Sequence, residues 1–178
     1  PADRRFHAQP LACPACGPRL TLTDAGGAVI PGDPLVNAGD LLTRGRIVAV
    51  KGLGGFHLAV RADDPAAVLR LRERKRRETK PLALLVRDLA TARELVDLDE
   101  AGCALLTSPA APIILASRRP SSAVAAAVAP GTDLLGVMLP STPLHHLLCD
   151  HAPPVLVLTS GNASGEQLCH DDAEARAC

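Results

Sequence analysis

Short apolar segments alternate with segments of helical spacing along most of this chain. The apolar segments are residues 47–50, 57–60, 82–86, 112–116, 135–139 and 155–159. The segments of helical spacing are residues 35–43, 65–71, 89–95, 100–106, 143–149 and 171–177. Strands that are apolar on both faces need helices packed against both faces of their sheet. We therefore predict an α/β fold whose open sheet is largely covered by helices.

Composition limits both the core and the ligands. A chain of 178 residues is long enough for one domain with its own core plus an appendage. It holds two Phe and no Tyr or Trp, so Leu, Val, Ile and Ala must form the core. Without aromatic rings for bases to stack on, binding of single-stranded nucleic acid is not expected. No apolar run approaches a membrane span and the N-terminus lacks an apolar signal segment, so we expect a cytoplasmic protein without a membrane partner.

Residues 1–32 are rich in Pro and Gly, and we interpret them as an appendage and linker. Within them, Cys13 and Cys16 form a C-x-x-C turn, which is the spacing of half a tetrahedral zinc site. A structural site needs four ligands; His7 could be a third, and no second C-x-x-C follows. The pair is therefore either half of a zinc motif or idle in this chain. A redox role is disfavoured because no strand precedes the motif.

Cations gather in residues 70–80, which hold seven of the 19 Lys and Arg of a chain with zero net charge. Such a focus indicates one anionic ligand rather than general attraction to nucleic acid or membranes. The Pro that follows disfavours helical backbone at Lys80, so we expect the helix to end at about Thr79 and the last cations to lie on a loop. Lys75, Arg77 and Lys80 are candidates to clamp a polyphosphate. A solvated helix face is the alternative.

A Gly-rich loop offers a second set of candidate contacts. Lys51, Gly54 and Gly55, followed by Phe56 and His57, resemble a turn whose backbone closely approaches phosphate. The loop matches neither the Walker nor the dinucleotide-binding fingerprint, and an ordinary Gly-rich turn explains it equally well.

A third set of candidates follows the apolar segment 155–159. The hydroxyl and amide groups there belong to Thr159, Ser160, Asn162 and Ser164. Ligands of open α/β sheets bind at the carboxyl ends of strands, so these groups are expected to contact phosphate or ribose. An ordinary turn is the alternative. Ser141 lies on a similar hydroxyl-bearing corner.

The histidines near the C-terminus show no metal or catalytic pattern. His145 and His146 are adjacent on a helical segment, so they point in different directions and cannot bind one metal from a single face. We interpret them as core or surface residues. No Ser/His/Asp order and no catalytic pair of carboxylates is visible in the sequence.

Several stretches of the sequence, taken in order, resemble one family. They are residues 4–18, 51–59, 74–83, 136–140 and 159–165. The first resembles the end of the zinc-finger region of the hydrogenase maturation carbamoyltransferases HypF, and the others resemble their YrdC-like domain. The resemblance implies a zinc-finger region and linker over residues 1–32. It also implies a YrdC-like nucleotide-binding domain over residues 33–178, with a twisted, open mixed sheet and flanking helices.

The resemblance implies a specific chemistry. In that family the YrdC-like domain joins carbamate, supplied by carbamoyl phosphate, to ATP as carbamoyladenylate. Another domain then passes the carbamoyl group to the C-terminal Cys of the partner protein HypE. The chain would thus be an adenylate-forming module of a carbamoyltransferase that uses ATP and Mg²⁺, with Zn²⁺ at Cys13 and Cys16 if further ligands complete that site. Lys75 and Arg77 would stabilise charge at the α-phosphorus, and Phe56 and His57 would line the acyl end.

Other functions remain open at this stage. A threonylcarbamoyl-adenylate synthase for tRNA shares the YrdC-like fold. Two features argue against that function. One is the cysteine segment, and the other is Gly-Gly-Phe-His at residues 54–57, where that family usually has Thr-Val-Tyr-Gly. A binder of structured double-stranded RNA would use the basic run for phosphate contacts. A folded but inert module is the remaining possibility.

Overall fold

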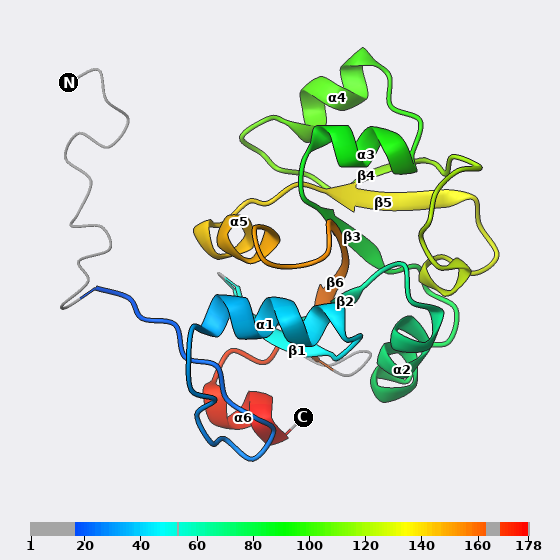
Figure 1. Ribbon diagram of the computed structural model, residues 1–178. Coiled ribbons are helices and arrows are strands. Elements are labelled where there is room, and N and C mark those ends of the chain that lie inside the picture. The colour runs from blue at the N-terminus through cyan, green and yellow to red at the C-terminus, as the bar shows by residue number, and fades with distance from the viewer. Residues whose placement is uncertain (1–16, 53, 163–167, 178) are drawn as a thin grey trace, which may run out of the picture.

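Figure 1 shows the computed structural model of the chain, which describes residues 17–52, 54–162 and 168–177. Within these residues the strands form one six-stranded sheet in the order β1-β2-β6-β3-β5-β4. The strands are β1 (Val48–Lys51), β2 (Phe56–Arg61), β3 (Ala83–Val86), β4 (Ile114–Ser117), β5 (Leu134–Met138) and β6 (Val155–Ser160). The β3–β5 pair is parallel and the other pairs are antiparallel. The predicted α/β fold with an open mixed sheet is therefore confirmed.

The helices begin where the sequence supplies caps. They are α1 (Pro34–Thr43), α2 (Pro65–Lys75), α3 (Leu89–Leu95), α4 (Glu100–Leu106), α5 (Pro143–Cys149), α6 (Asp172–Ala177) and the short 3₁₀ helix η1 (Ala126–Val128). The caps whose side chains accept hydrogen bonds from first-turn amides are Asp33, Asp64, Asp88, Asp99 and Thr142. Three of these helices also have Pro in the first turn, where its missing N–H costs nothing.

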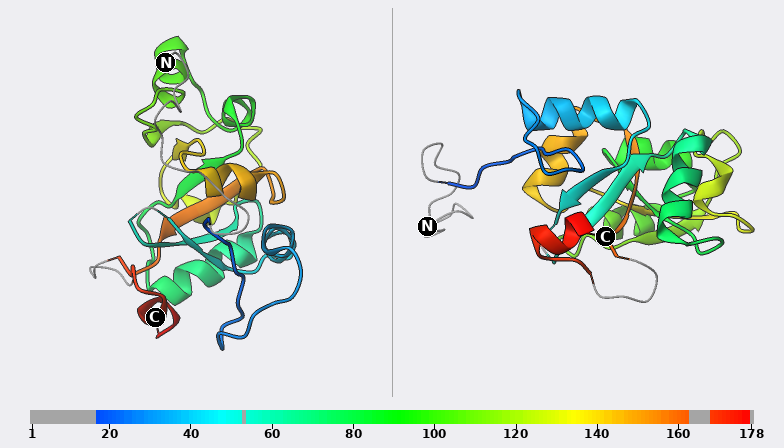
Figure 2. Two further views of the ribbon diagram at one scale, coloured as in Figure 1. Left: turned by 90° about the vertical axis from the view of Figure 1, so that its left-hand side faces the viewer. Right: turned by 90° about the horizontal axis from the view of Figure 1, so that it is seen from below.

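Two aliphatic clusters lie on the two faces of the sheet. One contains residues of α1 and α5 together with Ala59, Leu156 and Leu158. The other contains residues of α2, α3, α4 and η1 together with Val60 and Val157. Successive strand residues thus alternate between the clusters, as a pleated strand requires. Figures 1 and 2 show α1 and α5 close together over the sheet. None of the helices in the described residues is both long and apolar enough to cross a membrane.

The end of α2 corrects one expectation. The helix was expected to continue to about Thr79, but it ends at Lys75. Arg76 adopts left-handed backbone with φ of 49°, and the N–H of Arg77 bonds the carbonyl of Arg72. A left-handed residue just past the last turn satisfies the otherwise unpaired carbonyls and terminates a helix, so the chain turns earlier than the Pro would force it to. The cations after Lys75 therefore lie on a loop, as predicted.

Candidate functional site

The ammonium of Lys75 reaches from the last turn of α2 to the end of β6. Its Nζ donates hydrogen bonds to the carbonyl of Ser160 and, at 2.7 Å, to the carbonyl of Asn162. Lys75 is only 4% exposed, and its burial, with the Arg77 charge as a second cause, lowers the pKa of the ammonium. An ammonium has three N–H donors. The two carbonyls take two of them, and the hydrogen bonds to described residues leave the third for a ligand.

Arg72 organises the loop that follows Lys75. Its Nη1 donates to the carbonyls of Arg77, Glu78 and Lys80 at 2.8, 3.1 and 3.2 Å. Its other nitrogens bond the carbonyls of Ala127 and Val128 near η1. A planar guanidinium with five donors can fasten several backbone segments at once. Arg72 is therefore a structural residue that holds the loop in shape.

Arg77 and Lys80 lie on that loop. The guanidinium of Arg77 bonds the carbonyls of Lys80 at 3.3 Å and Pro81 at 2.6 Å. It is half-buried and close enough to Lys75 to lower the pKa of that ammonium, whereas Lys80 is exposed. Lys75 and Arg77 thus form one positive centre in which the described residues supply carbonyl acceptors and no carboxylate.

The pairing of β2 with β6 brings the other predicted loops to the same place. His57 pairs with Ser160, and the amide of Gly161 donates to the carbonyl of Phe56 at 2.7 Å. A side chain at Gly161 would place its Cβ 2.7 Å from that carbonyl oxygen, so only Gly fits this close approach. Thr159, which precedes Ser160 on β6, is buried. The register of β2 with β6 therefore brings together the Gly-rich loop and the hydroxyl-bearing loop, which are far apart in the sequence.

The Gly-rich loop packs against the segment before α6. The amide of Gly52 bonds the carbonyl of Gly55 at 2.8 Å, and Gly55 has φ of 145°. A Cβ on Gly55 would lie 2.5 Å from the carbonyl of Cys169, whereas Gly54 is exposed. Lys51 forms an exposed ion pair with Asp172 and lies 5.3 Å from the centroid of the Phe56 ring. This pairing reduces the charge that Lys51 can add to an anion site.

The structure places His145 close to one of the candidate residues, His57. His145 is 6% exposed on α5, and its ring centroid lies 6.5 Å from that of His57 in an edge-to-face arrangement. Burial lowers the pKa of both imidazoles. His145 was interpreted as a core or surface residue, and the structure shows that it is buried. Sequence spacing could not show that it meets His57, because the two belong to different elements.

Of the remaining predicted residues, the structure describes Ser141 and does not describe the others. Ser141 is exposed just before Thr142, the cap of α5. Ser164, Cys13 and Cys16 lie outside the described residues. Among the residues that the structure does describe, no group of three or more His, Cys, Asp or Glu could hold a metal ion.

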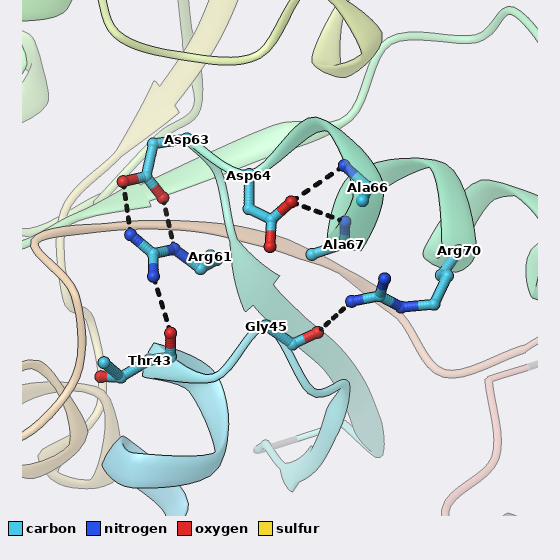
Figure 3. Close-up of polar contacts among 8 residues, drawn as sticks. All are labelled: Thr43, Gly45, Arg61, Asp63, Asp64, Ala66, Ala67 and Arg70. Carbon is cyan, nitrogen blue, oxygen red and sulfur yellow. Dashed lines mark hydrogen bonds and ion pairs between the residues drawn. The ribbon is translucent and has the colours of Figure 1, made fainter.

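Four cations of the basic run are not among the candidate site residues: Arg70, Arg72, Arg74 and Arg76. Arg70, near the middle of α2, bonds the carbonyl of Gly45 at 2.8 Å (Figure 3). Arg72 fastens carbonyls, and Arg74 is exposed on the last turn. The run therefore combines structural cations with the pair formed by Lys75 and Arg77.

Two family models match this chain. One, described as telomere recombination and named for Sua5, YciO and YrdC, matches residues 40–177. The other, described as HypF finger, matches residues 1–23.

Curated relatives match over nearly the whole chain. The carbamoyltransferase HypF of Rhodobacter capsulatus is 56% identical over 176 residues, covering 99% of this chain and 23% of the relative. The carbamoyltransferase HypF2 of Cupriavidus necator is 47% identical over 172 residues, covering 88% of this chain and 21% of the relative. The chain therefore spans less than a quarter of the length of these relatives.

Solved structures agree with the sequence comparisons. Full-length HypF in its phosphate- and nucleotide-bound form superposes with a TM-score of 0.87 at 41% identity, over 98% of this chain and 23% of that one. HypF of T. kodakarensis superposes with a TM-score of 0.92 at 38% identity, over 99% and 23%. P. abyssi Sua5 complexed with L-threonine has a TM-score of 0.72 at 19% identity, over 81% and 43%, which shows similarity of fold alone.

Proposed function

Because the chain belongs to the Sua5/YciO/YrdC family, we propose that it binds ATP and joins carbamate to the α-phosphoryl group. A carbamate oxygen attacks the α-phosphorus, the bond from that phosphorus to the bridging oxygen of the β-phosphate breaks, and pyrophosphate leaves. The product is carbamoyladenylate. The carbamoyl substrate is favoured by the similarity to HypF carbamoyltransferases that the sequence predicted and the 56% identity confirms.

The observation that carries this proposal is the contact of Lys75 with the carbonyls of Ser160 and Asn162. It joins the basic run to the hydroxyl-bearing loop, although the two are far apart in the sequence. A buried cation with no carboxylate partner among the described residues is costly unless an anion uses it. The nucleotide- and phosphate-bound form of full-length HypF, which is 41% identical, supports a nucleotide as that anion.

Each candidate residue has a role in this proposal. Lys75 and Arg77 would stabilise the charge that develops around the α-phosphorus, where preorganised cations contribute most. The residues that would contact the nucleotide or the substrate are Lys51, Gly54, Gly55, Lys80, Ser141, Thr159, Ser160, Asn162 and Ser164. Mg²⁺ would be held mainly by the polyphosphate, since it needs few protein ligands.

The larger context is also part of the proposal. The chain would act within a carbamoyltransferase that matures NiFe hydrogenase, with carbamoyl phosphate as donor and a HypE-type protein as acceptor. The match of residues 1–23 to the HypF finger supports Cys13 and Cys16 as zinc ligands within a finger that other residues complete. The division at residue 33 between finger region and nucleotide-binding domain remains a prediction.

Calorimetry with ATP and Mg²⁺, with and without carbamoyl phosphate or ammonium carbamate, tests the binding step. Exchange of labelled pyrophosphate into ATP tests the chemical step. We expect exchange to depend on carbamate and not on threonine, and threonine-dependent exchange would instead indicate a threonylcarbamoyl-adenylate synthase.

A variant of the buried ammonium tests the site itself. Lys75→Met keeps an unbranched apolar side chain of similar length and removes the charge, so ATP affinity should fall by roughly 2–3 kcal/mol. Arg74→Ala is the matched control, because Arg74 lies one residue earlier on the same turn and is exposed. Equal ATP affinity of the two variants would contradict the assignment.

A further inference from the structure

Two histidines of the candidate site contain buried ring nitrogens that the described part of the chain leaves without a hydrogen-bond partner. These are Nδ1 of His57 and both Nδ1 and Nε2 of His145. His57 lies on β2 and His145 on α5, and the centroids of their rings are 6.5 Å apart with the planes at 79°. Unpaired polar atoms are therefore concentrated at one place, next to the strand end that Lys75 contacts.

This concentration is costly for a purely structural arrangement. Buried polar atoms in folded proteins nearly always have a partner. Each buried nitrogen without a partner lowers the free energy of unfolding, because it has lost its hydrogen bonds to water and gained none in the protein. The rest of this face of the sheet is aliphatic, with Ala59 two residues after His57 and Leu148 three residues after His145. An aliphatic side chain would pack there without this penalty.

Close packing holds both rings in place. A Cβ on Gly52 would lie 2.6 Å from Nδ1 and Cε1 of His57, so the absence of a side chain at Gly52 makes room for that ring. On the other side, Oγ1 of Thr142 accepts a hydrogen bond from the amide of His145 at 3.1 Å and fixes the first turn of α5. The pair is thus positioned by a glycine on the loop before β2 and by the cap of α5.

The chemistry of the pair suits a small group that both donates and accepts hydrogen bonds. Burial lowers the pKa of both imidazoles and so favours their neutral forms, and the neighbouring His57 and His146 lower the pKa of His145 further. A neutral imidazole has one N–H donor and one acceptor nitrogen. A carbamoyl group matches this set, because its NH₂ donates to a ring nitrogen and its oxygen accepts from a ring N–H. An acetyl group of the same shape has a methyl in place of the NH₂ and leaves the acceptor unpaired.

We propose that His145, together with His57, recognises the NH₂ end of the carbamoyl group. This recognition would make His145 a specificity-determining residue. The location fits, because His57 pairs across the sheet with Ser160, whose carbonyl accepts from Lys75. The acyl group is thereby held beside the centre that binds the α-phosphate. This inference rests on the proposed adenylate chemistry and adds the group that selects the acid.

The test compares acids that differ only at the recognised end. Pyrophosphate exchange is measured with ammonium carbamate and with sodium acetate, with sodium bicarbonate as the control for hydrolysed carbamate. A site that hydrogen-bonds its substrate strongly rejects an analogue lacking the bonded group, so the wild type should prefer carbamate by about 100-fold or more. His145→Leu should reduce this preference at least tenfold, chiefly through kcat/KM for carbamate. His145→Gln retains a donor and an acceptor and should restore most of it.

The outcomes separate the two proposals. If the wild type shows no carbamate-dependent exchange, the proposed function fails. If the wild type is active but His145→Leu lowers exchange with carbamate and acetate equally, or changes neither, the specificity role of His145 is wrong. Thermal melting of each variant identifies loss of folding, and a folded His145→Gln variant that does not restore the preference for carbamate would also overturn the inference.

Discussion

The two ends of α2 use the same residue types for different purposes. At its start, Arg61 donates to both oxygens of Asp63 at 2.7 Å and Asp64 caps the helix, while Arg70 reaches from the middle of the helix to the carbonyl of Gly45 nearby (Figure 3). At its end, the hydrogen bonds of the buried Lys75 to described residues go to carbonyl oxygens, those of Ser160 and Asn162. Charges paired with carboxylates or used as caps stabilise the fold, whereas a buried cation without a carboxylate indicates a place for an anionic ligand.

The largest expected effect concerns Arg72, the structural cation at the end of α2. Arg72→Ala removes the donors to five carbonyls, several of them part-buried, at about 1–3 kcal/mol for each group left unpaired. Because water can replace the lost donor at the part-buried carbonyls, we expect the free energy of unfolding, measured by urea denaturation, to fall by roughly 3–4 kcal/mol, less than the full sum. A loss below about 1 kcal/mol would mean that the loop keeps its shape without this residue.

Arg77 should show the opposite profile, with a large effect on binding and a small one on stability. Arg77→Ala removes a charge-assisted contact to the polyphosphate, so ATP affinity measured by calorimetry should fall by roughly 2–3 kcal/mol. Its bonds to the carbonyls of Lys80 and Pro81 lie on the half-exposed loop, so the urea midpoint should change little. Unchanged affinity with a lowered midpoint would place Arg77 among the structural cations.

At the start of α2, the cap should affect stability alone. Asp64→Ala removes the acceptor for the amides of Ala66 and Ala67, and such a cap contributes about 1 kcal/mol. ATP affinity, measured in parallel, should stay at the wild-type value. Weakened ATP binding in the folded variant would show that the two ends of the helix are coupled.

The smallest effect is expected from the pH dependence of the Arg61–Asp63 pair. The hydrogen bond from Arg61 is the main cause that lowers the pKa of Asp63. The stabilisation is therefore complete above the usual Asp pKa of about 3.9 and is lost as the pH falls through the lower pKa of the folded state. Because both side chains are partly exposed, the contribution should be about 0.5–1 kcal/mol.

Urea denaturation between pH 7 and pH 3 measures this contribution. Asp63→Asn should lose the stabilisation at neutral pH and show a flatter decline of stability at acid pH than the wild type. Parallel pH profiles for the two proteins would mean that this ion pair contributes nothing measurable.

Much of the fold could be predicted from local signals. The apolar segment 155–159 corresponds to β6, and the expected helices over residues 89–95, 100–106 and 143–149 have the observed bounds. These elements are marked by caps such as Asp99 and Thr142, whose side chains act within one turn. The expected end of α2 was wrong because a left-handed residue at Arg76 terminated the helix before the Pro could.

The candidate site was predictable only in part. The sequence identified the cations and hydroxyls, and the register of β2 with β6 then brought the marked strand ends together. Periodicity and charge could not separate Arg72 from Lys75, because both are cations on the last turn and their partners lie elsewhere in the chain. The sequence could not suggest the role that we propose for His145, because its contact with His57 depends on how α5 packs over the sheet.

The sequence by itself determined where strands and helices form and which family the chain resembles, because caps, apolar spacing and short motifs act over a few neighbouring residues. Only the tertiary structure shows which acceptors each cation meets, and therefore which cations we propose for a ligand and which for the stability of the fold. That distinction depends on acceptors supplied by segments distant in the sequence, and only the order and register of the strands bring those segments within hydrogen-bond distance.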